Sequence, residues 1–469
     1  MSKVRRAALS AGLVLAVGAA VAIPSSAAPT SSKAHSAGDH PKGPSPALRS
    51  MLREIEARRV QSDIAKLVSF GTRHTLSSQT DPNRGIGAAR DWIYDQFQSY
   101  AAASGGRMTV QKQSFVQPPG PRNPDPVTVT NLVATLHGTQ PESANRVYVI
   151  SGHYDSRCTD VLNVTCDAPG ADDDASGVAA VLELARVMAE RQFDATIVFM
   201  AVAGEEQGLY GSTFFAQQAK AQGMDVEGML DNDIVGSSTS DKGRRDPFTV
   251  RLFSEGVPTT ETPAQAALRQ SIGGENDGPS RQLARYIKEV GENSATQMHV
   301  RLIWRRDRYL RGGDQIPFLQ QGYPAVRFTE PAENFAHQHQ DVRVENGQQF
   351  GDLLQFVDFA YTARVARVNG AALANLAWAP TAPKNAKIDT TQLTNDTTLK
   401  WDANPEPDLA GYEVVWREST DPLWTHTIPV GNVTTYTIPD LSKDNVQVGV
   451  RAVDRDGYRS PVAFPIPQS

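Results

Sequence analysis

Three apolar, β-branched runs separated by helical segments constrain this chain more than any other feature of its sequence. The runs RVYVI (146–150), ATIVFMAVA (195–203) and VEGMLDNDIV (226–235) have the composition of strands buried on both faces. Between the first and second runs, apolar residues of segment 175–190 recur at helical spacing. Between the second and third runs, residues 210–222 supply a second helical segment. Strands alternating with helices form a largely parallel sheet covered on both faces. We therefore expect an α/β fold, with a mixed, mostly parallel sheet sandwiched by helices.

The two ends of the chain differ from this central region, 46–370. Residues 1–27 have a basic start, an apolar stretch and small residues, which are typical of a secretory signal peptide. The Ser-, Pro-, Ala- and Gly-rich residues 28–45 predict a disordered leader. Residues 371–382 predict a linker, and the short Val-, Thr- and Tyr-rich runs of residues 383–469 predict an all-β sandwich domain. The protein is therefore expected to be secreted after cleavage of the signal peptide, by the general or the twin-arginine route, with an uncleaved membrane anchor as the alternative.

Charge and cysteine content narrow the classes of partner. The chain has 46 basic and 52 acidic residues, and no basic block follows its N-terminus. Nucleic acid and anionic membranes are therefore not expected as partners. The two cysteines, Cys158 and Cys166, have seven residues between them, which is not a zinc-finger spacing. Because export permits oxidation, we predict a disulfide, with two free thiols or a metal-binding pair as the alternatives.

Acidic and imidazole side chains follow the expected strands. In parallel sheets, ligands bind at the carboxyl ends of the strands, so these side chains are expected to converge in one crevice. Imidazoles together with carboxylates suit a divalent ion such as zinc. The residues concerned are His153 and Asp155, the run Asp172 to Asp174, Glu205 and Glu206, Asp233, and His337, His339 and Asp341.

The number of carboxylates favours two ions over one. A single ion with three protein ligands would leave some of these carboxylates without a metal ion. With two Zn²⁺ ions, the charges of three carboxylates and one hydroxide together offset those of the metal. Glu205 then remains free to act as general base and acid, and Asp155 can orient the nearby imidazole. Each motif also has a structural explanation, such as helix capping by the aspartate run, but their joint occurrence behind buried strands favours a metal site. The five candidate ligands are His153, Asp173, Glu206, Asp233 and His337.

Four segments together resemble a known family. SGHYDS, APGADDDASGVAAVLELAR, GEEQGLYGS and HQHQD are similar to the signature segments of the secreted bacterial di-zinc aminopeptidases, which have glutamate carboxypeptidases and glutaminyl cyclases as relatives. The resemblance covers roughly residues 50–365. It implies the same five ligands, with Asp173 bridging two zinc ions, Glu205 as general base, and a cis peptide between Asp173 and Asp174. It also implies that Asp155 and Asp341 orient the histidines.

The resemblance leaves the oxyanion donor open. The family places a tyrosine before an SDH segment, whereas this chain has RDRYLRGGDQIPF, in which Tyr309 is one residue out of step. Arg311 is the alternative donor. At the C-terminus, Trp401, Tyr412 and the segment VGVRAVDRDGYRSP resemble a fibronectin type III domain, which would contact a surface or polymer.

These features predict a secreted di-zinc exopeptidase that acts on peptides or proteins. Among the exopeptidases, an aminopeptidase is the preferred prediction. A carboxypeptidase of the same fold remains an alternative, because Arg305, Arg306, Arg308 and Arg311 could clamp a substrate carboxylate. A glutaminyl cyclase and a catalytically dead binding protein are further alternatives. The complete ligand set and the presence of Glu205 disfavour both.

Overall fold

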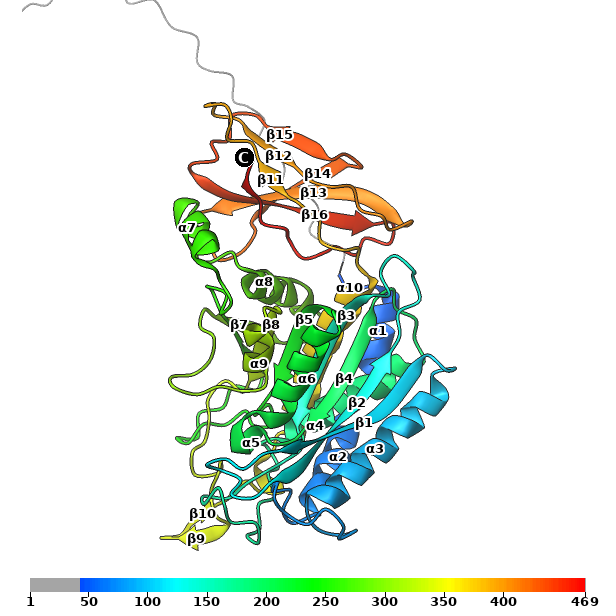
Figure 1. The fold of residues 1–469 in the computed structure, drawn as a ribbon, viewed down its shortest axis with the longest axis vertical. Helices are drawn as coiled ribbons and strands as arrows, with labels where there is room; N and C mark the ends of the chain where they lie inside the picture. The colour runs from blue at the N-terminus through cyan, green and yellow to red at the C-terminus, as the bar shows by residue number, and fades with distance from the viewer. Residues whose placement is uncertain (1–42, 469) are drawn as a thin grey trace, which may run out of the picture. The chain divides into compact units, whose positions relative to one another are not determined.

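A computed structural model describes residues 43–468 of the chain (Figure 1). The expected signal peptide and nearly all of the expected leader therefore lie outside the described residues. Within residues 43–468, no helix combines the length and the apolar character needed to cross a membrane.

The core of the fold is an eight-stranded mixed sheet with the order β1-β2-β4-β3-β5-β8-β6-β7. Strands β4, β3, β5 and β8 run parallel to one another. At the edges of this parallel group, β2 is antiparallel to β4 and to β1, and β6 is antiparallel to β8. Every residue of β3 and β4 is buried, as their unbroken apolar runs predict. The strands are β1 (Met108–Gln117), β2 (Val127–Leu136), β3 (Arg146–His153), β4 (Thr196–Val202), β5 (Asp225–Asn232), β6 (Thr249–Ser254), β7 (His299–Ile303) and β8 (Ala325–Thr329).

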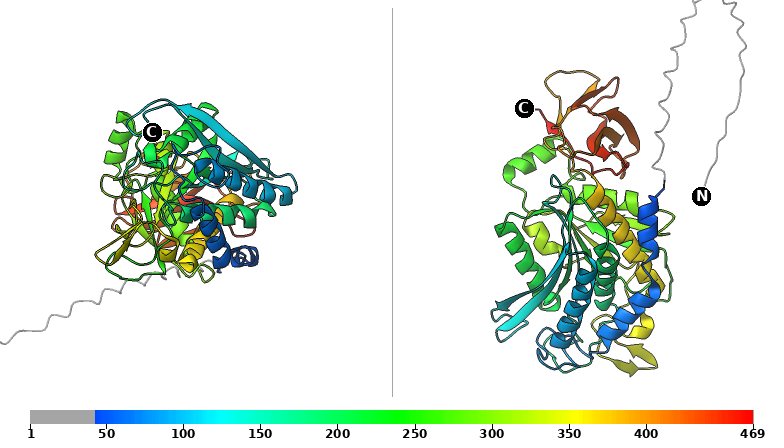
Figure 2. Two further views of the ribbon diagram at one scale, coloured as in Figure 1. Left: turned by 90° about the horizontal axis from the view of Figure 1, so that it is seen from below. Right: turned by 90° about the vertical axis from the view of Figure 1, so that its right-hand side faces the viewer.

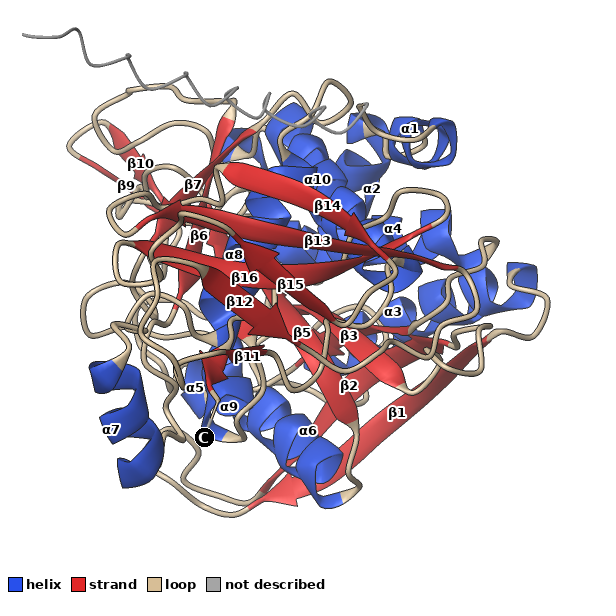
Figure 3. Cartoon of the chain, turned by 90° about the horizontal axis from the view of Figure 1, so that it is seen from above, coloured by secondary structure: helices blue, strands red, loops and turns tan. Residues whose placement is uncertain are grey.

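Helices cover both faces of this sheet, which confirms the predicted α/β class (Figures 2 and 3). On one face α1, α2, α3, α4, α8 and α10 share one apolar core, and on the other α6 and α9 share a second core. The helices are α1 (Pro46–Arg53), α2 (Ala57–Val68), α3 (Ile86–Ala103), α4 (Ala175–Ala189), α5 (Glu205–Gly208), α6 (Tyr210–Ala221), α7 (Pro263–Ser271), α8 (Pro279–Gly291), α9 (Gln315–Gln320) and α10 (Phe359–Trp378). A short hairpin, β9 (Arg343–Glu345) and β10 (Gln348–Phe350), precedes α10.

Helix α10 departs from the linker that the sequence suggested. It continues through residues 371–378, where Leu373 and Leu376 are fully buried. An alanine-rich composition favours a helix as much as a linker, and the apolar residues at helical spacing decide for the helix.

The C-terminal region is an all-β sandwich, as predicted. A four-stranded sheet (β15-β12-β11-β17) and a three-stranded sheet (β14-β13-β16) enclose a separate core that contains Trp401, Tyr412 and Val450. The strands are β11 (Lys387–Ile388), β12 (Thr397–Lys400), β13 (Leu409–Glu418), β14 (His426–Gly431), β15 (Thr435–Ile438), β16 (Val446–Asp454) and β17 (Ile466–Pro467).

Ion pairs join this sandwich to helix α8 and to the loop that precedes it. Arg417 of β13 contacts both carboxylate oxygens of Asp277 at 2.9 and 2.8 Å, and both side chains are almost fully buried. Arg451 of β16 pairs with Glu289 at 2.8 Å. Helix α8 therefore packs on two sides, with its apolar face on the sheet and its polar face on the sandwich.

Candidate metal centre

Donor side chains converge at the carboxyl ends of β3, β4 and β5, near α5. His153, Asp173 and Asp233 form one group whose ligand atoms lie within 4.8 Å of one another. Asp173, Glu206 and His339 form a second group by the same measure. Four of the five candidate ligands are thus brought together, and Asp173 belongs to both groups.

The local backbone explains why Asp173 is the shared residue. The side chain of Asp174 accepts hydrogen bonds from the amides of Gly177 at 2.9 Å and His153 at 3.0 Å, so it caps α4 and holds the end of β3. The carboxylate of Asp352 accepts the amide of Asp173 at 2.8 Å. The peptide between Asp173 and Asp174 is cis, as the resemblance implies. Helix capping thus accounts for one acid of the run and leaves Asp173 for the site.

Asp155 holds two parts of the site together. Its Oδ1 atom lies 3.6 Å from Nδ1 of His153, and the side chain is completely buried. The same carboxylate accepts the backbone amides of Glu205 at 3.3 Å and Glu206 at 3.2 Å. Asp155 is therefore placed to orient the imidazole and to fix the start of α5.

Glu205 lies among other acids. Burial raises its pKa well above the usual range, and the carboxylates of Glu206, Asp233 and Asp314 add to this effect, whereas His153 opposes it. No hydrogen bond to its side chain is present among the described residues. A raised pKa and a free carboxyl group are the properties of a residue that accepts and returns a proton.

His339, and not His337, lies in the second group. Nε2 of His339 is 2.9 Å from both Asp173 Oδ2 and Glu206 Oε1. His337 instead stacks on Phe356 with ring centroids 3.7 Å apart. The geometry thus favours His339 as the last ligand.

The Asp341 carboxylate, expected to orient the last histidine, accepts the amide of Thr159 at 3.2 Å, and the Asp341 amide bonds to the Thr159 hydroxyl at 3.1 Å. Thr159 follows Cys158, whose predicted disulfide with Cys166 is present. The disulfide loop thereby contacts the segment that carries His339.

Two arginines that the sequence analysis did not single out contact the candidate ligands. Nε of Arg157 lies 2.9 Å from Oε2 of Glu206. Arg327 of β8, which is fully buried, pairs with Oδ2 of Asp233 at 2.8 Å. A cation inside an apolar strand must meet a carboxylate, so the arginine in YPAVRFTE was a usable sequence signal. Arg157 lies in a loop and gives no such signal.

Neither candidate oxyanion donor has a position that identifies it. Tyr309 is 79% exposed, and its ring lies under Arg305, with 3.5 Å between the guanidinium carbon and the ring centroid. Arg311 pairs with Glu333 at 2.5 Å, and Arg308 reaches the same carboxylate at 3.3 Å. Two of the four arginines of this segment are therefore already paired.

The donor atoms fit two divalent cations. Nε2 of His153 and Oε1 of Glu206 are buried and make no hydrogen bond of good geometry within residues 43–468, although each lies close to another donor atom of the set, at 3.1 Å from Asp173 and 2.9 Å from His339. Two groups of one imidazole and two carboxylates, sharing one carboxylate, form a donor set that zinc accepts. The set therefore satisfies the chemistry expected from the sequence.

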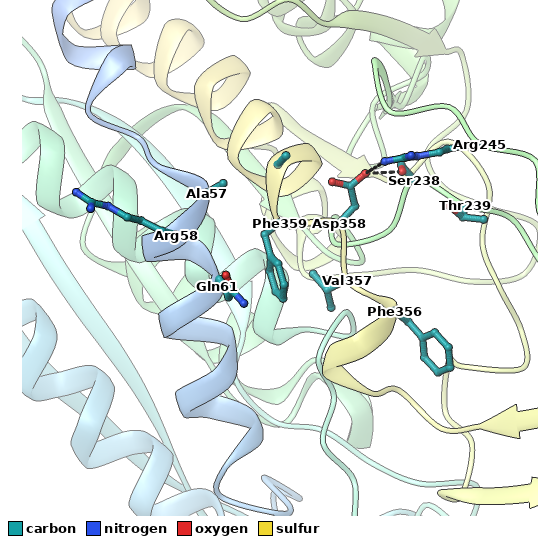
Figure 4. Close-up of a pocket in the computed structure, with 11 residues that line it drawn as sticks. Ala57, Arg58, Gln61, Ser238, Thr239, Arg245, Phe356, Val357, Asp358 and Phe359 are labelled. Carbon is teal, nitrogen blue, oxygen red and sulfur yellow. Dashed lines mark hydrogen bonds and ion pairs between the residues drawn. The ribbon is translucent and has the colours of Figure 1, made fainter.

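A hollow of about 610 Å³ lies elsewhere, beside α2 and the start of α10 (Figure 4). Figure 4 shows Arg245 and Ser238 reaching the carboxylate of Asp358. No side chain of the two donor groups lines this hollow. The position of the site therefore rests on the donor atoms and not on the size of a cavity.

Comparisons with known proteins identify relatives of this chain. Residues 131–348 match the description "Peptidase family M28". The chain is 56% identical over 429 residues to a "Probable zinc metalloprotease" of Pyrenophora teres f. teres, over 91% of this chain and 88% of the relative. A protein of the same name from Pyricularia oryzae is 55% identical over 426 residues, over 90% of this chain and 84% of that one. Both of these relatives are fungal.

Among solved structures, the LapA aminopeptidase of Legionella pneumophila is similar over 71% of this chain and 74% of its own, with 19% identity and a TM-score of 0.49. The fungal relatives are more than half identical over nearly the whole described chain. The chain belongs to peptidase family M28.

Proposed function

We propose that this protein is a secreted di-zinc exopeptidase that releases N-terminal residues from peptides. It is a metallopeptidase by family, and its fungal relatives carry zinc in their names. The observation that carries the proposal is the pair of donor groups sharing Asp173, with Glu205 beside them. Secretion is supported by the composition of residues 1–27 and by the disulfide.

The residues divide into holding and proton-transfer roles. His153 and Asp233 would hold one zinc ion, Glu206 and His339 the other, and Asp173 would bridge them. When bound, the ions would polarise the scissile carbonyl and lower the pKa of water.

Glu205 would accept the proton of the attacking water and return it to the leaving amine. Its own position favours this role, because it lies next to Glu206 in the chain and its carboxyl group makes no hydrogen bond among the described residues.

An aminopeptidase is favoured over a carboxypeptidase by the state of the arginine segment. A carboxypeptidase needs a free cation to bind the C-terminal carboxylate of its substrate. Arg308 and Arg311 are both engaged by Glu333, and Arg305 lies over Tyr309. The clamp that would support the alternative is therefore largely occupied by the protein's own groups.

The C-terminal domain is proposed to be fibronectin type III-like. Its seven strands in two sheets and its core of Trp401 and Tyr412 support this. Contact with a surface or polymer through this domain remains part of the proposal.

A substrate panel tests the proposed activity. Aminoacyl anilides with free N-termini and N-blocked peptides are incubated with the protein, with and without a chelator. Cleavage of the free-amine set alone, lost on chelation and restored by zinc, is the expected result. Removal of C-terminal residues from the blocked peptides would contradict the aminopeptidase assignment and leave the metal site in place.

A further inference from the structure

We propose that Arg157 and Arg327 each hold the outer oxygen of one candidate ligand, so that Glu206 and Asp233 each offer a single oxygen to a cation. The proposal rests on the two-cation site of the proposed function. It assigns a positioning role to two arginines that lie outside the donor groups themselves.

The geometry at Glu206 separates its two oxygens. Oε1 faces the donor group, 2.9 Å from Nε2 of His339. Oε2 receives a hydrogen bond from Nε of Arg157 at 2.9 Å. Arg157 therefore contacts the outer oxygen of Glu206 and leaves the inner oxygen toward the second group.

The two carboxylate oxygens of Asp233 also have different partners. Its Oδ1 faces the first group, 4.0 Å from Nε2 of His153, and its Oδ2 pairs with Arg327 at 2.8 Å. Arg327 is itself fixed, because it also pairs with Asp307 at 3.3 Å and donates to the carbonyl of Gly312 at 2.6 Å. Glu206 and Asp233 thus each have one carboxylate oxygen that faces the site and one that contacts an arginine.

This arrangement has a chemical consequence. A carboxylate can bind a cation through one oxygen or through both. A guanidinium that contacts one oxygen, by a hydrogen bond as at Glu206 or by an ion pair as at Asp233, favours the first mode. A catalytic zinc site must keep a coordination position for water or substrate. An arginine that occupies the outer oxygen protects that position, and it also offsets part of the negative charge gathered around Asp173.

Arg157 is the better of the two for a test, because its side chain is 17% exposed whereas Arg327 is completely buried. Arg122 supplies a matched control. It donates to the backbone carbonyl of Glu206 at 2.8 Å and does not contact the carboxylate. Arg157→Met and Arg122→Met therefore remove the same charge from the neighbourhood of Glu206, but only the first frees Oε2.

The experiment loads each protein with Co²⁺, counts the bound ions and records the visible absorption, whose intensity falls as the coordination number rises. The wild type and Arg122→Met are expected to bind two ions with the same spectrum. Arg157→Met is expected to bind two ions with weaker absorption and to lose about 10–100-fold in kcat. Arg157→Lys, which keeps one donor, should give an intermediate spectrum, and it serves as the test if Arg157→Met does not fold.

An Arg157→Met protein with two ions and the wild-type spectrum would overturn the inference. So would loss of an ion without a spectral change in the remaining one, because Arg157 would then act on affinity alone. Failure of the proposed function looks different, since the wild type itself would bind fewer than two ions or hydrolyse none of the peptides.

Discussion

Breaking the ion pair between Arg417 and Asp277 should destabilise the whole protein and not the sandwich alone. Asp277 is 1% exposed and contacts Arg417 at 2.8 Å and Arg285 at 3.4 Å. Removing one partner of a buried pair typically costs about 3–5 kcal/mol, because the other charge is left unpaired. Arg285 remains beside Asp277 in Arg417→Met, so we expect the lower end, about 3 kcal/mol.

Urea unfolding followed by tryptophan fluorescence and circular dichroism measures this loss. Arg455→Met, an exposed substitution in the same sandwich, serves as the control and should change the free energy of unfolding by less than about 0.5 kcal/mol. Adding Asp277→Asn to Arg417→Met should cost less than the sum of the two single changes, because the pair is already broken. A loss below about 1 kcal/mol in Arg417→Met, or a sandwich that unfolds first in the wild type, would refute this reasoning.

Three further predictions concern the site and the pH dependence of stability. Glu205→Gln should lower kcat by about 100- to 10,000-fold while two zinc ions remain by elemental analysis, and loss of both ions would contradict the role given to Glu205. His339→Ala should lose one zinc ion, whereas His337→Ala should keep two by the same measurement; the reverse outcome would restore His337 as the ligand. Burial, reinforced by Glu183, raises the pKa of Asp63 to about 7, so its contribution to stability is complete below its unfolded pKa of 3.8 and is lost as the pH rises through 7. Asp63→Asn should therefore raise the melting temperature more at pH 8 than at pH 5, and an equal change at both would contradict the shift.

The sheet and most of the site could be predicted from the sequence because both depend on local signals. Unbroken apolar runs marked β3 and β4, and the acids and His153 directly behind buried strands had to meet at one edge of the sheet. The last ligand could not be predicted in this way. His337 and His339 lie in a turn without periodicity, and only the structure shows that His339, whose backbone is left-handed at φ 53°, is the one beside Asp173 and Glu206.

The polar residues of α8 and of the loop before it could not be assigned partners from the sequence either. Asp277, Arg285 and Glu289 are ordinary surface residues by composition, and they are engaged only because a sandwich more than 100 residues later in the chain meets them. Partners so distant in sequence leave no local pattern. The linker prediction failed for a related reason, since only packing distinguishes an alanine-rich linker from the end of α10.

The position of Cys158 connects the disulfide to the candidate metal site. The residue before it, Arg157, bonds to Glu206, and the residue after it, Thr159, bonds to Asp341 in the segment that carries His339. The disulfide therefore restrains the short segment 157–159, which contacts both Glu206 and the segment that carries His339. Reduction of the disulfide would make this segment more mobile without unfolding the sheet, because neither cysteine belongs to a strand or a helix. Reduction should therefore change the affinity of the protein for divalent cations, whereas its melting temperature should stay close to that of the oxidised form.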